Sequence, residues 1–336
     1  QGAGEQTVCQ EEGGVLPHLP TGAERAAGAS APPPPNDNIV IAVAGLGSST
    51  TQHGGAITLD ATMYEMDLQT LGYSADNVFH FSYRGIEDRG GTGPYRLHAP
   101  YGREDTYKSI EDSATLLSQQ VKEIHRRYPD RKIDIVAHSQ GGVVAQYYVE
   151  FLYDPDNTTG IRLDHLVTIG SPHGGDELAR LGPQLSDDLA GKVTLLGLNR
   201  FANAAGLPPP GSPAAMQLAT DSSFMRELHG AWDPTKVHAT TIASAFDYVV
   251  TSDRTRLEGA DTYTIATLSP QGMLAAHGEV VEAARPYVYN ALANRRSPCT
   301  ALLNKLADRG TAAFIAGNEA LLIYLLDHLW IGSFVR

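Results

Sequence analysis

One stretch of the sequence, KIDIVAHSQGGVVAQYYVE at residues 132–150, places a serine where it could act as a nucleophile. The apolar, β-branched run that ends at Val136 has the character of a buried strand. Ser139 follows, between Ala137 and Gly141, and apolar residues then resume at helical spacing. A strand, a sharp turn and a helix predict that the Ser139 Oγ is held above the edge of a sheet, facing substrate. The alternative is an ordinary strand–helix turn with an incidental serine.

A serine hydroxyl is a poor nucleophile near neutral pH, so it requires a base, and the base requires a carboxylate that orients it. After an elbow of this kind, the acid and then the histidine follow in the sequence. Asp247 comes just past an apolar run at residues 237–243 and is the favoured acid; Asp253 is its rival, and a capping role is the alternative. His277 is expected in a loop between the last strand and the closing helix. It is the favoured base, with a structural loop histidine as the alternative.

Attack on an acyl carbonyl creates a tetrahedral oxyanion, which needs two preorganised N–H donors. One expected donor is the backbone N–H of Gln140, the residue after the serine. The other is expected in the loop AGLG at residues 44–47, and we assign it to Leu46. The glycines of this loop also suit a tight turn between a strand and a helix, which is compatible with donation.

The rest of the chain alternates strands with helices, which predicts a parallel, doubly wound α/β sheet with catalytic loops at the carboxyl ends of its strands. Helical spacing predicts a helix over residues 110–124 and a closing helix over 287–292, with Pro286 in its first turn. Residues 84–106 lack periodicity and predict a surface insertion near the active edge. Apolar runs predict strands at residues 38–44, 77–83, 133–136, 163–169, 237–243 and 263–267.

The chain resembles the bacterial lipase and esterase branch of the α/β-hydrolase superfamily. The resemblance rests on the segments AGLGSS, AHSQGG, TIGSPHGG and FDYVV and on the loop of His277, and it covers residues 38–295. It implies an α/β-hydrolase fold, cleavage of carboxylic esters through an acyl-enzyme, and no cofactor. The implied site consists of the triad Ser139, Asp247 and His277 and the oxyanion donors Leu46 and Gln140.

Two departures from the usual motifs of that branch stand out. Ala137 replaces the first glycine of G-x-S-x-G, which is a mild change because alanine is also small. Ala44 replaces the histidine that usually opens the His-Gly-x loop, but the expected donor there is a backbone N–H. The resemblance also implies that His173, in TIGSPHGG, is structural and not catalytic.

The ends of the chain and one internal segment lie outside the minimal catalytic unit. We predict a flexible leader at residues 1–37, a catalytic domain at 38–295 and a helical extension at 296–336. The apolar, Pro-rich residues 176–232 are longer than a simple crossover needs, which predicts a cap that lines an acyl pocket or an elaborated crossover that only packs on the core. The two cysteines, at positions 9 and 299, form one disulfide or stay as free thiols.

Composition excludes several classes of function. The 336 residues carry a net charge of −13 with no basic cluster, which argues against nucleic-acid binding. Neither a metal-ligand motif nor a dinucleotide or phosphate loop is present in the sequence, so no metal or cofactor is expected. Because the chain starts at Gln1, we expect a removed signal peptide and secretion, or a larger parent protein.

The sequence therefore predicts a serine hydrolase of small or lipid-like carboxylic esters, with transient contact to a lipid surface if the cap opens. An acyltransferase or a glycolipid deacylase would use the same triad. A hydrolase fold that only binds a partner is the alternative from another class, and the intact set of Ser139, Asp247 and His277 argues against it.

Overall fold

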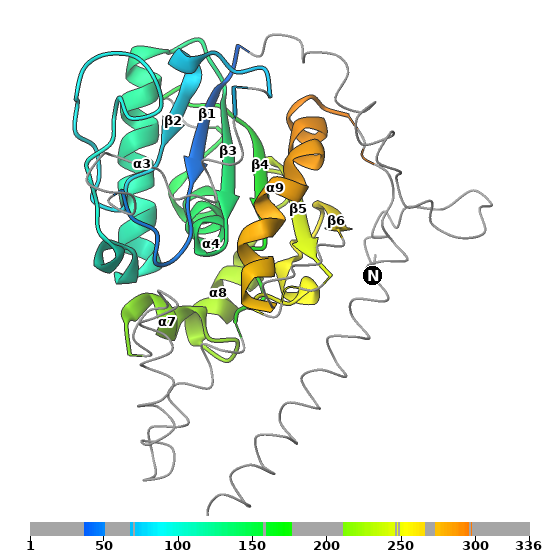
Figure 1. Ribbon diagram of the computed structural model, residues 1–336. Coiled ribbons are helices and arrows are strands. Elements are labelled where there is room, and N and C mark those ends of the chain that lie inside the picture. Colours follow the sequence, from blue (N-terminus) through cyan, green and yellow to red (C-terminus); the bar gives the residue numbers. More distant parts are fainter. Residues whose placement is uncertain are drawn as a thin grey trace, which may run out of the picture.

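The computed structural model describes part of the chain (Figure 1). Several predicted features lie outside it: the leader up to residue 36, both cysteines, the C-terminal extension and the middle of the 176–232 segment. The described residues are 37–50, 68–69, 71–156, 159–176, 211–245, 247, 249–265, 273–295 and 297.

Six strands form one sheet in the order β2-β1-β3-β4-β5-β6, and every pairing is parallel. All six lie at predicted positions, although β2 is shorter than predicted and β6 begins two residues earlier than expected. The parallel α/β sheet is therefore confirmed. The strands are β1 (Ile39–Val43), β2 (Val78–His80), β3 (Ile133–His138), β4 (Leu163–Ile169), β5 (His238–Ser244) and β6 (Asp261–Ile265).

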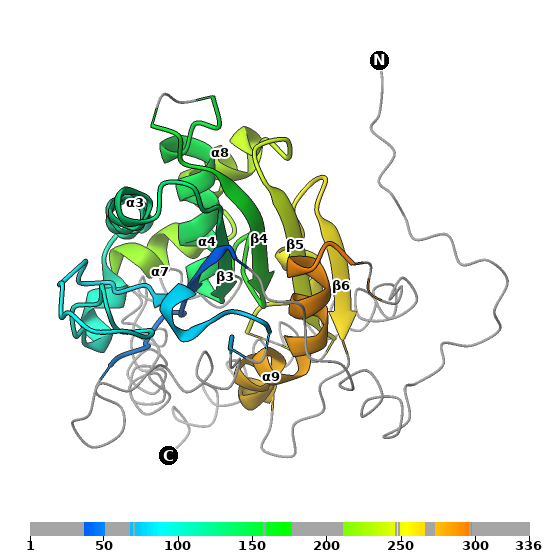
Figure 2. The ribbon, with the colours of Figure 1, turned by 90° about the horizontal axis from the view of Figure 1, so that it is seen from above.

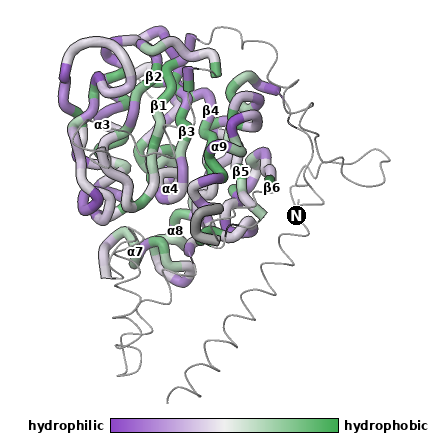
Figure 3. The backbone as a smooth tube through the Cα atoms, viewed as in Figure 1, coloured by the Kyte–Doolittle hydropathy of each residue, from purple (hydrophilic) through white to green (hydrophobic). Residues whose placement is uncertain are grey.

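Helices cover both faces of the sheet. α3 (Ile110–Arg127) and α4 (Gln140–Tyr147) pack on one face, and α9 (Met273–Leu292) packs on the other (Figure 2). Alternate residues of β1 enter the two cores: Ile39, Ile41 and Val43 face α3 and α4, whereas Val40 and Ala42 face α9. Figure 3 shows hydrophobic residues in the central strands β1, β3 and β4. None of the described helices is long and apolar enough to cross a membrane.

The helix α3 follows from its sequence. Its N-cap Ser109 accepts a hydrogen bond from the Asp112 backbone N–H, and acidic residues in the first turn suit the positive end of the helix dipole. The predicted apolar stripe over residues 110–124 is buried against the sheet. The helix ends two residues before Pro129, which disfavours helical backbone in the residue that precedes it.

The closing helix differs from its prediction. The helix does not begin near Pro286: α9 already starts at Met273 and carries this proline in its interior. Pro286 removes a backbone donor, but the face formed by Val281, Ala284 and Val288 is completely buried against the sheet. Burial of that face outweighs the cost of the proline. His277 consequently lies on a helix, and the prediction of a loop at this position was wrong.

The segment at residues 84–106 is only partly a surface insertion. Its first half is largely exposed, but Leu97, Tyr101 and Thr106 are at most 4% exposed, the last within the short 3-10 helix η2 (Arg103–Tyr107). Its second half is therefore part of the core, contrary to the prediction.

Five further short elements complete the described fold. α7 (Pro213–Leu218) and α8 (Ser223–Ala231) belong to the predicted cap segment and lie at the end of the sheet toward which the strands point (Figure 1). Their Ser212 and Ser222 N-caps accept hydrogen bonds from backbone N–H groups in the first turn. These elements are η1 (Ala75–Asn77), the π-helical turn η3 (Tyr148–Leu152), η4 (Ser252–Thr255), α7 (Pro213–Leu218) and α8 (Ser223–Ala231).

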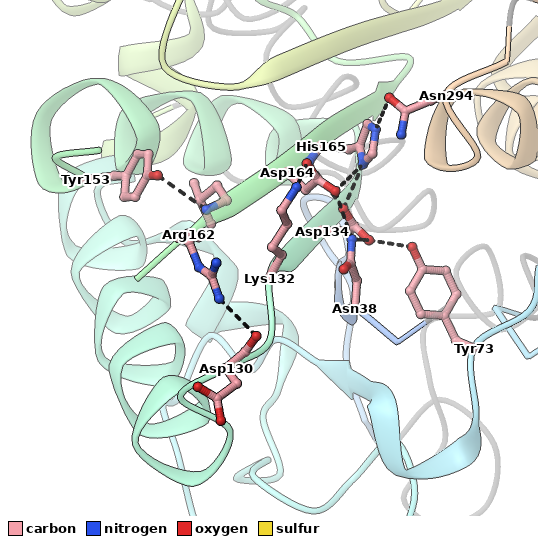
Figure 4. A network of polar contacts seen from close by, with 11 residues as sticks. Asn38, Tyr73, Asp130, Lys132, Asp134, Tyr153, Arg162, Asp164, His165 and Asn294 are labelled. Atoms are coloured by element: carbon pink, nitrogen blue, oxygen red, sulfur yellow. Dashed lines mark hydrogen bonds and ion pairs between the residues drawn. The ribbon is translucent and has the colours of Figure 1, made fainter. Parts of the chain in front are cut away.

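A buried polar network joins β3 and β4 near their amino ends (Figure 4). The Asp134 carboxylate, fully buried, accepts from His165 through one oxygen and from Tyr73 and Asn38 through the other. The second ring nitrogen of His165 meets Asn294, just past the end of α9. Asp164, His165 and His238 are near enough to share a metal ion, but both His165 nitrogens already have partners. The network therefore joins β3, β4 and the end of α9 through buried hydrogen bonds.

Candidate active site

Ser139 occupies a strained turn between β3 and α4. Its φ is 54° and its ψ is −133°, in the positive-φ region that non-glycine residues rarely adopt. Hydrogen bonds fix the turn on both sides: the Ser139 backbone N–H donates to the Ile169 carbonyl at 2.9 Å, and its carbonyl accepts from the Gly142 N–H at 3.0 Å. Neighbouring structure therefore stabilises the strained conformation, as the elbow pattern predicts.

Glycine is required on the helix side of the elbow. A Cβ on Gly141 would lie 2.6 Å from the carbonyl oxygens of both Val43 and Ala44. These are backbone atoms of β1 and the residue that follows it, so they cannot move aside as a flexible side chain could. The absence of a side chain lets α4 start against the carboxyl end of β1, beside the loop that holds the second predicted oxyanion donor.

The structure brings the three predicted triad side chains together. The Ser139 Oγ lies 2.9 Å from His277 Nε2, and His277 Nδ1 lies 2.6 Å from Asp247 Oδ2. The other Asp247 oxygen accepts from the backbone N–H groups of Val249 and Val250, at 2.9 and 3.0 Å. With Nδ1–H donating to the carboxylate, Nε2 is left as the acceptor for the serine proton.

Asp253, the rival acid, is not part of this arrangement. Its carboxylate accepts from the Thr251 hydroxyl at 2.6 Å and lies 3.6 Å from the Arg254 guanidinium, with 42% of its side chain exposed. Asp247, by contrast, is only 2% exposed and its carboxylate is directed at the imidazole. The geometry therefore favours Asp247.

The loop after β1 lies directly against Ser139. A Cβ on Gly45 would fall 2.7 Å from the Ser139 Cβ and 3.2 Å from its Oγ, so only glycine fits. Leu46 follows this glycine, and Gln140 follows the serine as the first residue of α4. Among the described residues, none accepts a hydrogen bond from the backbone N–H of Leu46 or Gln140. Both predicted donors therefore flank Ser139, and within the described part of the chain their backbone amides have no acceptor.

Comparisons with known proteins define the fold. A family described as a domain of unknown function, DUF7379, matches residues 108–219. The chain is 30% identical over 129 residues to the antibacterial effector protein Tle3 of Pseudomonas aeruginosa, over 38% of this chain and 16% of the effector. The lipase BlEst2 of Bacillus licheniformis, in propeptide form, superposes with a TM-score of 0.50 at 16% identity, over 80% of this chain and 53% of the lipase chain. The chain has the α/β-hydrolase fold.

This result confirms the predicted fold class, and it confirms the resemblance to bacterial lipases and esterases as a likeness of fold. The chain spans about half the length of the lipase chain and less than a fifth of the effector protein. These partial matches therefore show the fold of the chain and not its activity.

One neighbour of His277 was not predicted from sequence. The ring of His138, which precedes the serine, lies 4.8 Å from the His277 ring, and its Nε2 is 2.9 Å from the His277 carbonyl oxygen. Burial lowers the pKa of His138 to about 3, with a smaller effect from His277, so the ring is neutral and donates Nε2–H to that carbonyl. The contact fixes the turn of α9 that carries His277. In the sequence, only the position of His138 inside AHSQGG pointed to this contact.

His173 binds residues of α4 and β4, whereas His138 contacts His277 of α9. The side chain is completely buried, with Nδ1 2.8 Å from Gln146 Oε1 and Nε2 2.9 Å from the Thr168 hydroxyl. Burial lowers its pKa to about 3, so the ring is neutral. Because the Gln146 Oε1 only accepts, His173 Nδ1 carries the proton and Nε2 accepts from Thr168. These contacts join α4 to β4 and fit the structural role expected for this histidine.

Proposed function

We propose that this chain is a serine hydrolase of carboxylic esters, with lipid-like acyl esters as its substrates. One observation carries the proposal: Ser139, on a strained elbow, His277 and the buried Asp247 form an unbroken hydrogen-bonded series. That series supplies a nucleophile, a base and an orienting carboxylate, which are the groups that acyl transfer needs.

In the proposed mechanism, His277 Nε2 takes the proton of the Ser139 hydroxyl while the Oγ attacks the ester carbonyl carbon. The carbonyl oxygen becomes an oxyanion and accepts from the backbone N–H groups of Gln140 and Leu46. As this intermediate collapses, the C–O bond to the alcohol breaks and His277 passes the proton to the departing oxygen. Asp247 stabilises the transient imidazolium and fixes its orientation.

The acyl-enzyme is then hydrolysed by the same groups in reverse order. A water molecule loses a proton to His277 and attacks the acyl carbon. The second oxyanion accepts hydrogen bonds from the same two backbone N–H groups. Its collapse releases the carboxylic acid, and Ser139 Oγ recovers a proton from His277. An alcohol in place of the water would give an acyltransferase, so product analysis with water and alcohol in competition distinguishes the two activities.

The lipid-like substrate class rests on two lines of support. The fold is shared with a lipase, and the sequence places apolar residues such as Leu198, Phe201 and Leu207 in the segment that follows β4. The strand before that segment ends at the catalytic edge, beside Ser139. An apolar segment that begins in the sequence after β4 suits recognition of an acyl chain.

The test uses p-nitrophenyl esters of increasing acyl length with wild type and Ser139→Ala. Wild type should turn over these esters and favour longer acyl chains, while Ser139→Ala should lose roughly 10³-fold or more. Labelling by a fluorophosphonate should occur only where Ser139 is present. An unlabelled wild type with no esterase activity would refute the proposal and favour a fold used only for binding.

A further inference from the structure

Thr106 contacts both sides of the predicted oxyanion hole. Its side chain accepts from the backbone N–H of Gly47 at 2.9 Å, and its carbonyl oxygen accepts from the Gln140 side-chain Nε2 at 2.9 Å. Gly47 follows Leu46, the predicted donor from the β1 loop, and Gln140 supplies the other donor. A single residue from η2 therefore holds a neighbour of one donor and the side chain of the other.

The hydroxyl of Thr106 has a fixed orientation. It donates its own proton to the Arg103 carbonyl at 2.7 Å, which leaves its lone pairs for the Gly47 N–H. Thr106 is completely buried, so water cannot replace either hydrogen bond. Both partners of this hydroxyl are backbone atoms, and the hydrogen bond therefore determines backbone position in the loop.

The anchored loop has little freedom around Leu46. On one side Gly45 packs against Ser139, and on the other Gly47, with a φ of 75°, is held by Thr106. Further along, the Thr50 backbone N–H donates to the Tyr101 carbonyl at 3.0 Å, so the same segment of the chain holds the loop at a second point. The peptide between residues 45 and 46 thus lies between two fixed points.

We propose that Thr106 is a positioning residue that preorganises the oxyanion hole by fixing the Leu46 and Gln140 backbone amides relative to Ser139. The inference rests on the proposed ester hydrolysis and adds a role for residues 84–106, which the sequence presented only as an insertion. Donors that are already oriented cost no reorganisation when the oxyanion forms. Fixing them therefore lowers the barrier for the chemical step and leaves the affinity for the substrate unchanged.

The experiment compares Thr106→Val, which keeps the shape and the backbone carbonyl but removes the hydroxyl, with Thr106→Ser, which keeps the hydroxyl. Thr241→Val is the control, because the Thr241 hydroxyl is also buried and meets the Thr262 hydroxyl at 3.1 Å within the sheet. Thr106→Val should lower kcat roughly tenfold with little change in KM, less than the loss of a donor itself, which costs about 10²–10³. Thr106→Ser and Thr241→Val should keep kcat near that of wild type.

An arylboronic acid, which forms a tetrahedral anionic adduct with an activated serine, provides the second readout. Its affinity should fall in Thr106→Val by the same factor as kcat/KM, while melting curves identify any unfolded variant. Equal kinetics in Thr106→Val and Thr241→Val, or a lower kcat with unchanged boronate affinity, would overturn the inference. Wild-type protein that neither hydrolyses esters nor binds the boronate would instead contradict the proposed function.

Discussion

Replacement of Asp134 by asparagine should destabilise the fold strongly. The carboxylate accepts four hydrogen bonds: two from His165, through its backbone N–H at 3.2 Å and its Nδ1 at 2.8 Å, one from Tyr73 at 2.6 Å and one from Asn38 at 3.0 Å. Asparagine offers one oxygen and an NH2 group. Whichever way its amide turns, the NH2 group faces two groups that donate to Asp134 in the wild type.

The size of the effect follows from these partners. Asp134 and His165 form an ion pair in which the two side chains are 0% and 4% exposed. Removal of one member of a buried pair costs about 3–5 kcal/mol, because the other is left buried without compensation. Two hydrogen bonds to a charged group are worth about 1.5–3 kcal/mol each, which gives a similar range. We therefore expect Asp134→Asn to lower the free energy of unfolding by about 3–5 kcal/mol.

The effect should depend on pH in a defined direction. Burial opposes the charged form of His165, but the hydrogen bond and charge of Asp134, helped by Asn294 and Asp164, prevail and raise its pKa. A raised pKa contributes stability that is complete below the unfolded value of about 6.5 and is lost as the pH rises through the folded value. The difference in stability between wild type and Asp134→Asn should therefore be larger at pH 6 than at pH 9.

Urea denaturation at these two pH values measures both predictions. Glu123→Gln serves as the control, since Glu123 pairs with Arg126 and Arg127 in the last turns of α3, where the side chains are partly open to solvent that screens the charges. If Asp134→Asn were no more destabilising than Glu123→Gln, or if the difference from wild type grew with pH, the ion-pair interpretation would be wrong.

The remaining predictions concern the active site. Asp247→Asn should lower kcat by about 10⁴-fold, as the same change does in serine proteases, where it stabilises the wrong histidine tautomer. Asp253→Asn should change kcat little. If Asp253→Asn instead lowered ester turnover more than Asp247→Asn, the acid would be Asp253. Gly141→Ala places a Cβ 2.6 Å from two backbone carbonyl oxygens, so the elbow must shift. A displacement of the nucleophile by 1 Å costs about 10² in rate. Gly230→Ala in α8, where an added Cβ meets nothing within 4 Å, should leave turnover unchanged, and a Gly141→Ala variant with wild-type kcat would show that the elbow tolerates the side chain.

The features that the sequence predicts well are local. The strand at 163–169 matches β4 at both ends, and the elbow needs only a strand, small neighbours and a helix within residues 132–150. The order of acid and histidine after the serine then favoured Asp247, with Asp253 as its rival, and His277. The structure places both beside Ser139, although 108 and 138 residues separate them from it in the chain.

Features set by tertiary contacts could not be predicted in this way. Because α9 contains Pro286, its sequence predicts a shorter helix that begins near this proline. The helix begins at Met273 instead, and only the burial of one of its faces against the sheet explains the difference. Thr106 lies in a stretch without periodicity, and its partners are 59 and 34 residues away. His165 reads as one of several polar residues in its strand until the fold places Asp134 next to it.

The ion pair and the active site lie at opposite ends of the same framework. Asp134 is the second residue of β3 and Ser139 follows its last, so one strand connects the buried carboxylate to the nucleophile. α9 repeats this relation, with His277 in its second turn and Asn294 just past its end. A helix of this length rises by about 30 Å, so the charge of His165 is remote from the oxyanion. Variants at Asp134 should therefore act on stability and variants at Thr106 on kcat, because each network fixes a different end of the elements that carry the triad.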